Sequence, residues 1–147
     1  MDPLQFLVPL GWLSAVGPVL PYAIFTMAVA NLVTRHLAHR RHVDQGSDGD
    51  SVEPYTPHVF TNVGLLLLGV LFAIDSPVSG VIISVIVVTM LIADLFELEA
   101  RNVEARNDMT IEAPKSAIAA SALLMVFASY YALFFLVEGI WNQFIVA

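Results

Sequence analysis

Two carboxylates one helical turn apart, Asp94 and Glu97, are the residues of this sequence with the clearest capacity for chemistry. They stand at positions i and i+3 near the end of a long apolar run, and a helix places such residues on one face. Carboxylates at membrane depth are costly and usually face protein, a cavity or a partner charge. The pair could therefore form a proton or cation site. A structural role is favoured, because the 97–106 stretch is aqueous in character and arginines are at hand, namely Arg35, Arg40 and Arg101.

Within this structural role the two carboxylates are expected to differ. Asp94 lies deeper in the apolar run, so we expect it to be a buried anchor for a cation. Glu97 lies nearer to water and precedes Arg101 by four residues, the favourable order for a helical ion pair. We therefore expect Glu97 to form a surface pair with Arg101.

Histidines form the second group of candidates: His36, His39, His42 and His58. His36 and His39 share a helix face, and His58 opens the next apolar run. Neutral imidazoles beside carboxylates could hold a metal ion, and two of them could hold a haem. The spacing matches no specific metal motif, and the arginines interleaved with the first three histidines equally fit a basic anchor to anionic lipid. We predict no metal site and no cofactor.

Two amides, Asn31 and Asn62, stand within or near apolar runs. An amide in an apolar region must find a hydrogen bond, most simply on a neighbouring helix. We therefore predict that both side chains form interhelical hydrogen bonds.

The composition indicates the kind of element that positions these residues. Hydrophobic residues make up 58% of the 147 residues and charged residues only 13%, whereas soluble proteins contain roughly 45–50% apolar and 25% charged residues. A chain with so few charges could not cover its surface in water, so lipid is expected to cover it. The absence of cysteine excludes disulfides, thiolate metal sites and cysteine nucleophiles.

Four apolar runs predict an all-α fold, a four-helix transmembrane bundle with a short N-terminal interfacial helix. Helix starts are indicated where Thr56 precedes Pro57 and where Ser76 precedes Pro77. The third helix is expected to continue beyond the membrane to about Arg106. The predicted elements of this single membrane domain are an interfacial helix over about 4–16, spans over about 18–34, 58–74, 78–98 and 114–141, and loops over 35–57 and 99–113.

Basic residues predict the orientation of these spans. With four spans, all six fall on one side of the membrane: Arg35, Arg40, Arg41, Arg101, Arg106 and Lys115. The positive-inside rule then places the 35–57 and 99–113 loops in the cytoplasm. The chain is thus expected to be a multi-pass protein of the cell membrane with both termini extracellular.

The formal net charge of −7 and the acidic stretch between Asp44 and Asp50 suggest a protein that works in high salt, where charge repulsion is screened. A family resemblance agrees with this habitat. The segments 37–42, 103–108 and 114–115 resemble those of a small membrane-protein family from halophilic archaea, a domain of unknown function. The resemblance covers nearly the whole chain and implies a haloarchaeal four-span protein, but it carries over no activity and no functional residue.

The sequence contains no motif for a reaction, a phosphate or nucleic acid. The soluble segments are too small for a catalytic domain, and the spans carry too few polar residues to line an obvious pore. We therefore expect a non-enzymatic accessory or structural subunit that binds other membrane components, with the lipid bilayer, other membrane subunits or a second copy of itself as partners. Small residues four apart on the last span, such as Ala128 and Ala132, allow close packing of helices within or between chains. Two alternatives stay open: a small oligomeric ion-coupled transporter or channel, and a metal- or haem-binding redox protein.

Overall fold

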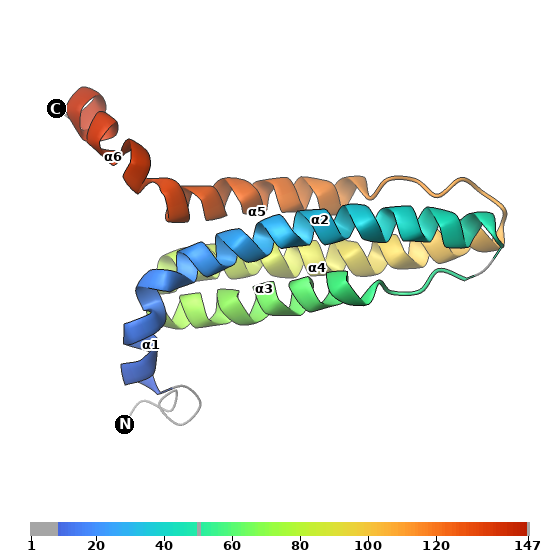
Figure 1. Cartoon of the computed structure of the whole chain (residues 1–147), viewed down its shortest axis with the longest axis horizontal. Helices are drawn as coiled ribbons and strands as arrows, with labels where there is room; N and C mark the ends of the chain where they lie inside the picture. Colours follow the sequence, from blue (N-terminus) through green and yellow to red (C-terminus); the bar gives the residue numbers. More distant parts are fainter. Residues whose placement is uncertain (1–8, 50, 147) are drawn as a thin grey trace.

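Four long helices lie side by side in a bundle (Figure 1). The structure is a computed structural model that describes residues 9–49 and 51–146. The bundle helices are α2 (Leu20–Ser47), α3 (Thr56–Asp75), α4 (Pro77–Arg106) and α5 (Lys115–Leu133). No strand occurs in the described part of the chain, and four helices are long and apolar enough to cross a membrane. The expected all-α class with four membrane-length helices is confirmed.

Successive helices of the bundle run in opposite directions, so α2 and α4 are parallel to one another (Figure 1). One end of the bundle, which we call the charged end, contains the ends of α2 and α4 and the starts of α3 and α5. Every arginine and lysine of the sequence lies on the half of a helix nearest this end. The opposite end contains the tight turn between α3 and α4.

The α3–α4 turn depends on a glycine. Ser76 interrupts the helix and Pro77 starts the next one, as the sequence predicts. A Cβ atom on Gly80 would lie 2.2 Å from the Cα atom of Ala73, closer than any atoms of two packed helices approach. Only glycine therefore allows the backbones of α3 and α4 to come together at this point.

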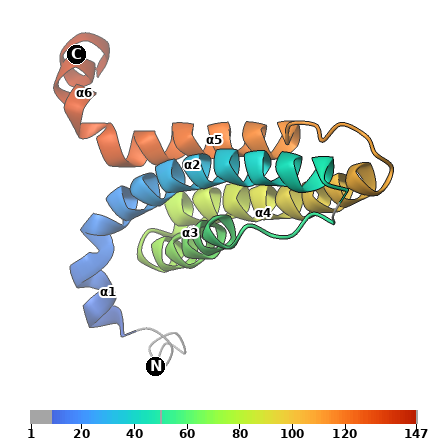
Figure 2. The ribbon, with the colours of Figure 1, turned by 45° about the vertical axis from the view of Figure 1, so that its right-hand side comes forward.

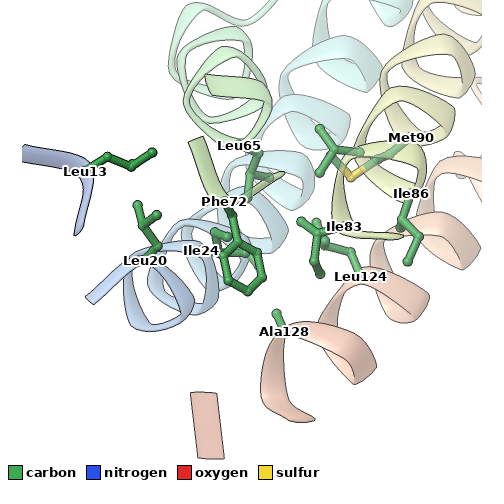
Figure 3. Close-up of a cluster of buried hydrophobic side chains, with 12 residues drawn as sticks. Leu13, Leu20, Ile24, Leu65, Phe72, Ile83, Ile86, Met90, Leu124 and Ala128 are labelled. Atoms are coloured by element: carbon green, nitrogen blue, oxygen red, sulfur yellow. The ribbon is translucent and has the colours of Figure 1, made fainter. Parts of the chain in front are cut away.

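Side chains from all four long helices fill the apolar core (Figure 3). The largest fully buried apolar side chains are Ile24 on α2, Leu65 on α3, Ile83 and Met90 on α4 and Leu124 on α5. The outer surfaces of the helices are also apolar and exposed, and the valines of α4 are an example. A bundle that is apolar inside and outside is suited to lipid rather than water.

Helix α2 continues farther than predicted. The 35–57 segment was expected to be a loop, but α2 extends to Ser47 and the irregular segment begins only after it. Two residues of this extension, Ala38 and His42, are buried, and His42 contacts Arg101 in the protruding part of α4. A small apolar cluster of Val52, Ala105 and Ile111 packs beside the contact between the α2 extension and α4. The extension is stabilised by packing, which the polar composition of the segment concealed.

Both ends of the chain leave the bundle (Figure 2). Helix α1 (Leu10–Val16) joins α2 through a short 3-10 turn at Gly17–Val19 and lies across its axis. A short helix is thus present where the interfacial helix was expected, and the predicted beginning at 4–8 lies outside the described residues. Helix α6 (Phe135–Trp141) turns away at Phe134, so the last span is shorter than the predicted 114–141. The α3–α4 hairpin ends at this level (Figure 1), and α6 meets the bundle only near its start, where the ring of Phe135 packs edge-on against Tyr22 of α2.

Candidate functional site

A group of hydrogen-bonded polar side chains joins α2, α3 and α4 within the half of the bundle nearest the charged end. We call it the polar cluster. Its members are Asn31, Thr34 and Arg35 on α2, His58, Thr61 and Asn62 on α3, and Asp94 on α4. On both α2 and α3 they stand at positions i, i+3 and i+4, the spacing that aligns residues on one helix face. Since apolar residues surround the polar cluster, its members must satisfy one another.

The centre of the polar cluster is an ion pair between Arg35 and Asp94. Two nitrogens of the guanidinium donate to the two carboxylate oxygens, and the Nη2–Oδ2 distance is 3.1 Å. Only 6% of the Arg35 side chain and 16% of the Asp94 side chain is exposed. Bidentate pairing of this kind fixes both the distance between the two side chains and their relative orientation. It therefore holds α2 and α4, which are not neighbours in sequence, in one register.

Helix α3 supplies the remaining donors to Asp94. The Nδ2 atom of Asn62 donates to Oδ2 at 3.0 Å, and Nε2 of His58 lies 3.2 Å from the same oxygen. Asn31 then closes the cluster: its amide nitrogen donates to Asn62 at 2.6 Å and to Thr61 at 2.9 Å, and its amide oxygen accepts from Arg35. Asn31 and Asn62 thus form the kind of interhelical hydrogen bonds that the sequence suggested.

His58 has hydrogen-bonding partners at both ring nitrogens. Its Nδ1 atom lies 3.0 Å from the hydroxyl of Thr34, and its Nε2 atom faces Asp94. A neutral ring would donate from Nε2 and accept from Thr34, whereas a protonated ring would donate to both. The same heavy-atom arrangement therefore accommodates His58 with or without an added proton.

A second buried contact joins α2 and α4 two helical turns closer to the charged end. Arg101 follows Asp94 by seven residues and His42 follows Arg35 by seven, and the Arg101 Nη1 atom donates to Nδ1 of His42 at 2.6 Å. His42 must then carry its proton on Nε2, which donates to the carbonyl oxygen of Glu53 at 2.8 Å. Nδ1 of His39 lies 3.4 Å from Nη2 of Arg101.

The structure brings together only some of the predicted site residues. Asp94, Arg35 and His58 meet in the polar cluster, and His39 lies beside Arg101. His36 and Arg40 are exposed on α2 and take no part. The polar cluster therefore does not include His36, Arg40 or His39, although they were expected to form one cluster with Asp94.

Glu97 also lies outside the polar cluster. It accepts a hydrogen bond of 2.7 Å from the hydroxyl of Ser116 on α5. Its expected ion pair with Arg101 is not among the pairs within 4.0 Å that the described residues form. A residue three positions farther along a helix is rotated by about 60° from the first, which is enough to direct Glu97 toward a different neighbour from Asp94.

Sequence reasoning missed Thr34 and Thr61 as members of the polar cluster, and it named His42 and Arg101 as candidates without predicting that they pair. The first two were detectable, because each is the i+3 member of a polar i, i+3, i+4 pattern inside an apolar run. The pairing of Arg101 with His42 was not detectable, because it depends on the register between two helices separated in sequence. In the described part of the chain no three histidine, aspartate or glutamate side chains come together in a way that could hold a metal ion.

A cavity of about 320 Å³ lies beside the polar cluster, between α2, α3 and α4. Its polar lining includes Arg35, Asp94 and Arg101, and its remaining lining is mainly apolar. Two of the apolar lining residues, Val63 and Leu95, are exposed on the surface of the bundle. The cavity therefore opens sideways, on the face of the bundle that apolar side chains cover.

Four apolar membrane-length helices, three of which are joined by the polar cluster, define a multi-pass helical membrane protein. The chain belongs to the family described as Domain of unknown function (DUF7313), whose model matches residues 2–145. This membership confirms the expected resemblance to a domain of unknown function over nearly the whole chain. No curated protein and no solved structure matches the chain.

The ion pair predicts unequal effects of neutralising the two carboxylates of α4. Asp94→Asn leaves the buried Arg35 without its counter-charge, which should lower the free energy of unfolding by about 3 kcal/mol. Glu97→Gln removes a charge at a partly exposed position and keeps an acceptor for Ser116, so its cost should stay below about 1 kcal/mol. Thermal melts of the two variants and the parent in one detergent make the comparison. Equal melting temperatures for Asp94→Asn and the parent would contradict the structural role of the pair.

Proposed function

We propose that this protein is a non-enzymatic accessory subunit that binds other membrane proteins within the bilayer. The first support is the closed character of the polar cluster. Asp94 accepts from three side chains, and Asn31 uses both its amide oxygen and its amide nitrogen inside the cluster. Side chains that bond mainly to one another are arranged to hold helices together rather than to act on a substrate.

The observation that carries the proposal is helix α6. None of its residues is buried within the described chain, although most of them are large and apolar. Leu136 and Ile140, which share one side of the helix, are exposed by 64% and 61%, and Trp141 on another side is exposed by 45%. An apolar helix that leaves its own bundle is suited to packing against a helix of another membrane protein.

Photocrosslinking from α6 tests this proposal. A photoreactive amino acid replacing Ile140 should yield discrete protein adducts in native membranes, because α6 is held against a partner. The matched control is Val85 on α4, which is equally apolar and 59% exposed but lies on the bundle surface. Mass spectrometry of the adducts distinguishes a foreign subunit from a second copy of this chain. Equal, diffuse labelling from both positions would contradict the proposal.

A second candidate function, an ion-coupled transporter, is favoured by His58. The ring lies between Thr34 and Asp94 in an arrangement that fits both of its protonation states, and Asp94 also lines the cavity. Proton flux into proteoliposomes that is abolished in a folded Asp94→Asn variant would support this function over the accessory role.

The proposed orientation places the charged end of the bundle in the cytoplasm of the cell and both termini outside. Its support is the one-sided distribution of arginine and lysine. The sequence has no cysteine, so single cysteines report cleanly. An impermeant thiol reagent applied to intact cells should label Ser76→Cys, in the α3–α4 turn, and should not label Ser47→Cys, at the end of α2. The reverse labelling pattern would overturn the orientation.

We also propose that the protein belongs to a halophilic archaeon and works at high salt. The support is its net charge of −7 and the resemblance of its loop segments. A surface with this excess of carboxylates repels itself when screening is weak. Dilution from molar salt to low salt in a nonionic detergent should therefore lower the melting temperature. A melting temperature that stays constant across this range would count against the proposed habitat.

A further inference from the structure

Arg101 is a buried cation whose partners are neutral. Only 6% of the residue is exposed, and its hydrogen-bonding partners are the ring nitrogens of His42 and His39. Its Nε atom is buried and has no hydrogen-bonding partner, and the same holds for the Nε atom of Arg35. No carboxylate among the described residues lies within 4.0 Å of its guanidinium, although Glu97 and Asp94 are near enough to attract it.

This situation differs from that of the other buried arginine. Arg35 has Asp94 as a direct counter-charge, and the two charges cancel. The same carboxylate bonds to Arg35, His58 and Asn62 and makes no contact with Arg101 within 4.0 Å. A buried guanidinium without a contacting anion is unfavourable, and an external anion would remove that penalty. The guanidinium has five N–H donors, so donors remain after the two contacts with histidines.

The cavity beside Arg101 has the form of a site for an amphiphile. Arg101 and His42 line it at the charged end, and the ion pair of Arg35 and Asp94 lines it about two helical turns deeper. Apolar residues of α3 and α4 line it toward the bundle surface, including Val59, Val63 and Leu95. All three of these apolar residues are exposed, so the opening faces the region that lipid covers. A volume of about 320 Å³ accommodates a small headgroup and the first part of one alkyl chain.

We propose that this cavity binds the anionic headgroup of an alkyl amphiphile, a phosphate or carboxylate that contacts Arg101 while its chain leaves between α3 and α4. The guanidinium pairs well with both kinds of oxyanion, and the apolar walls exclude the water that would weaken the contact. The site lies at the charged end of the bundle, far from α6, so it goes beyond the proposed partner binding and does not depend on it.

Dodecyl phosphate is the probe for this site, and dodecanol is its uncharged counterpart. Titration of the delipidated full-length protein in dodecyl maltoside should show saturable binding of dodecyl phosphate and at least tenfold weaker binding of dodecanol. Arg101→Gln should weaken the binding of dodecyl phosphate at least tenfold, because it removes the buried charge. The matched control is Arg106→Gln, five residues along α4 at an exposed position, which should bind like the parent.

A blocking variant keeps the test decisive if Arg101→Gln does not fold. Val63→Trp fills the opening from an exposed, lipid-facing position without changing any charge, and it should also abolish binding. Equal binding of dodecanol, an equal loss in Arg106→Gln, or full binding by folded Val63→Trp would each overturn the proposal. Competition by phosphatidylglycerol would identify a bilayer lipid as the source of the headgroup. Absence of this competition would identify a free single-chain amphiphile as the source. Both results are consistent with the proposed site.

Discussion

An arginine inside an apolar bundle needs a counter-charge at a defined distance, because the surrounding lipid offers no water to solvate it. Arg35 of α2 finds this counter-charge in Asp94 of α4, and the two-pronged contact allows little freedom between the helices. Helix α3 must lie beside both, because His58 and Asn62 provide the remaining donors to the same carboxylate. The ion pair thus determines which three helices meet and how they are aligned along the axis of the bundle. The apolar contacts elsewhere in the core could tolerate other registers far more easily.

The register set by this pair determines what lies at the charged end. Helices α2 and α4 are parallel, so a contact between residues 35 and 94 brings the residues seven positions farther along, His42 and Arg101, face to face as well. This second contact packs the extension of α2 on the protruding part of α4 and leaves Arg101 buried beside the cavity. The opposite end lacks such contacts among the described residues, and α1 and α6 leave the bundle there (Figure 2). One end is thus built around buried charge and the other around exposed apolar surface.

Much of this arrangement could be predicted from the sequence, because hydropathy and helix-start residues act locally. The number of long helices, the start of α3 at Thr56, the break at Ser76 and the protrusion of α4 to Arg106 are examples. The continuation of α2 through a polar segment could not be predicted from the sequence, because this part of the helix is stabilised by the tertiary packing of His42. The difference between Asp94 and Glu97 in depth was predictable, but their different partners depend on how α4 is rotated toward α2 and α5.

A double-mutant cycle on Arg35 and Asp94 tests most directly whether their ion pair holds the bundle together. The free energy of unfolding would be measured for the parent, Arg35→Gln, Asp94→Asn and the double variant under the same detergent conditions. Each single change leaves one buried charge unpaired and should cost about 3 kcal/mol. The double variant leaves none, so its loss should be well below the sum of the two single losses. Losses that simply add would show that the two side chains act independently and would contradict the account.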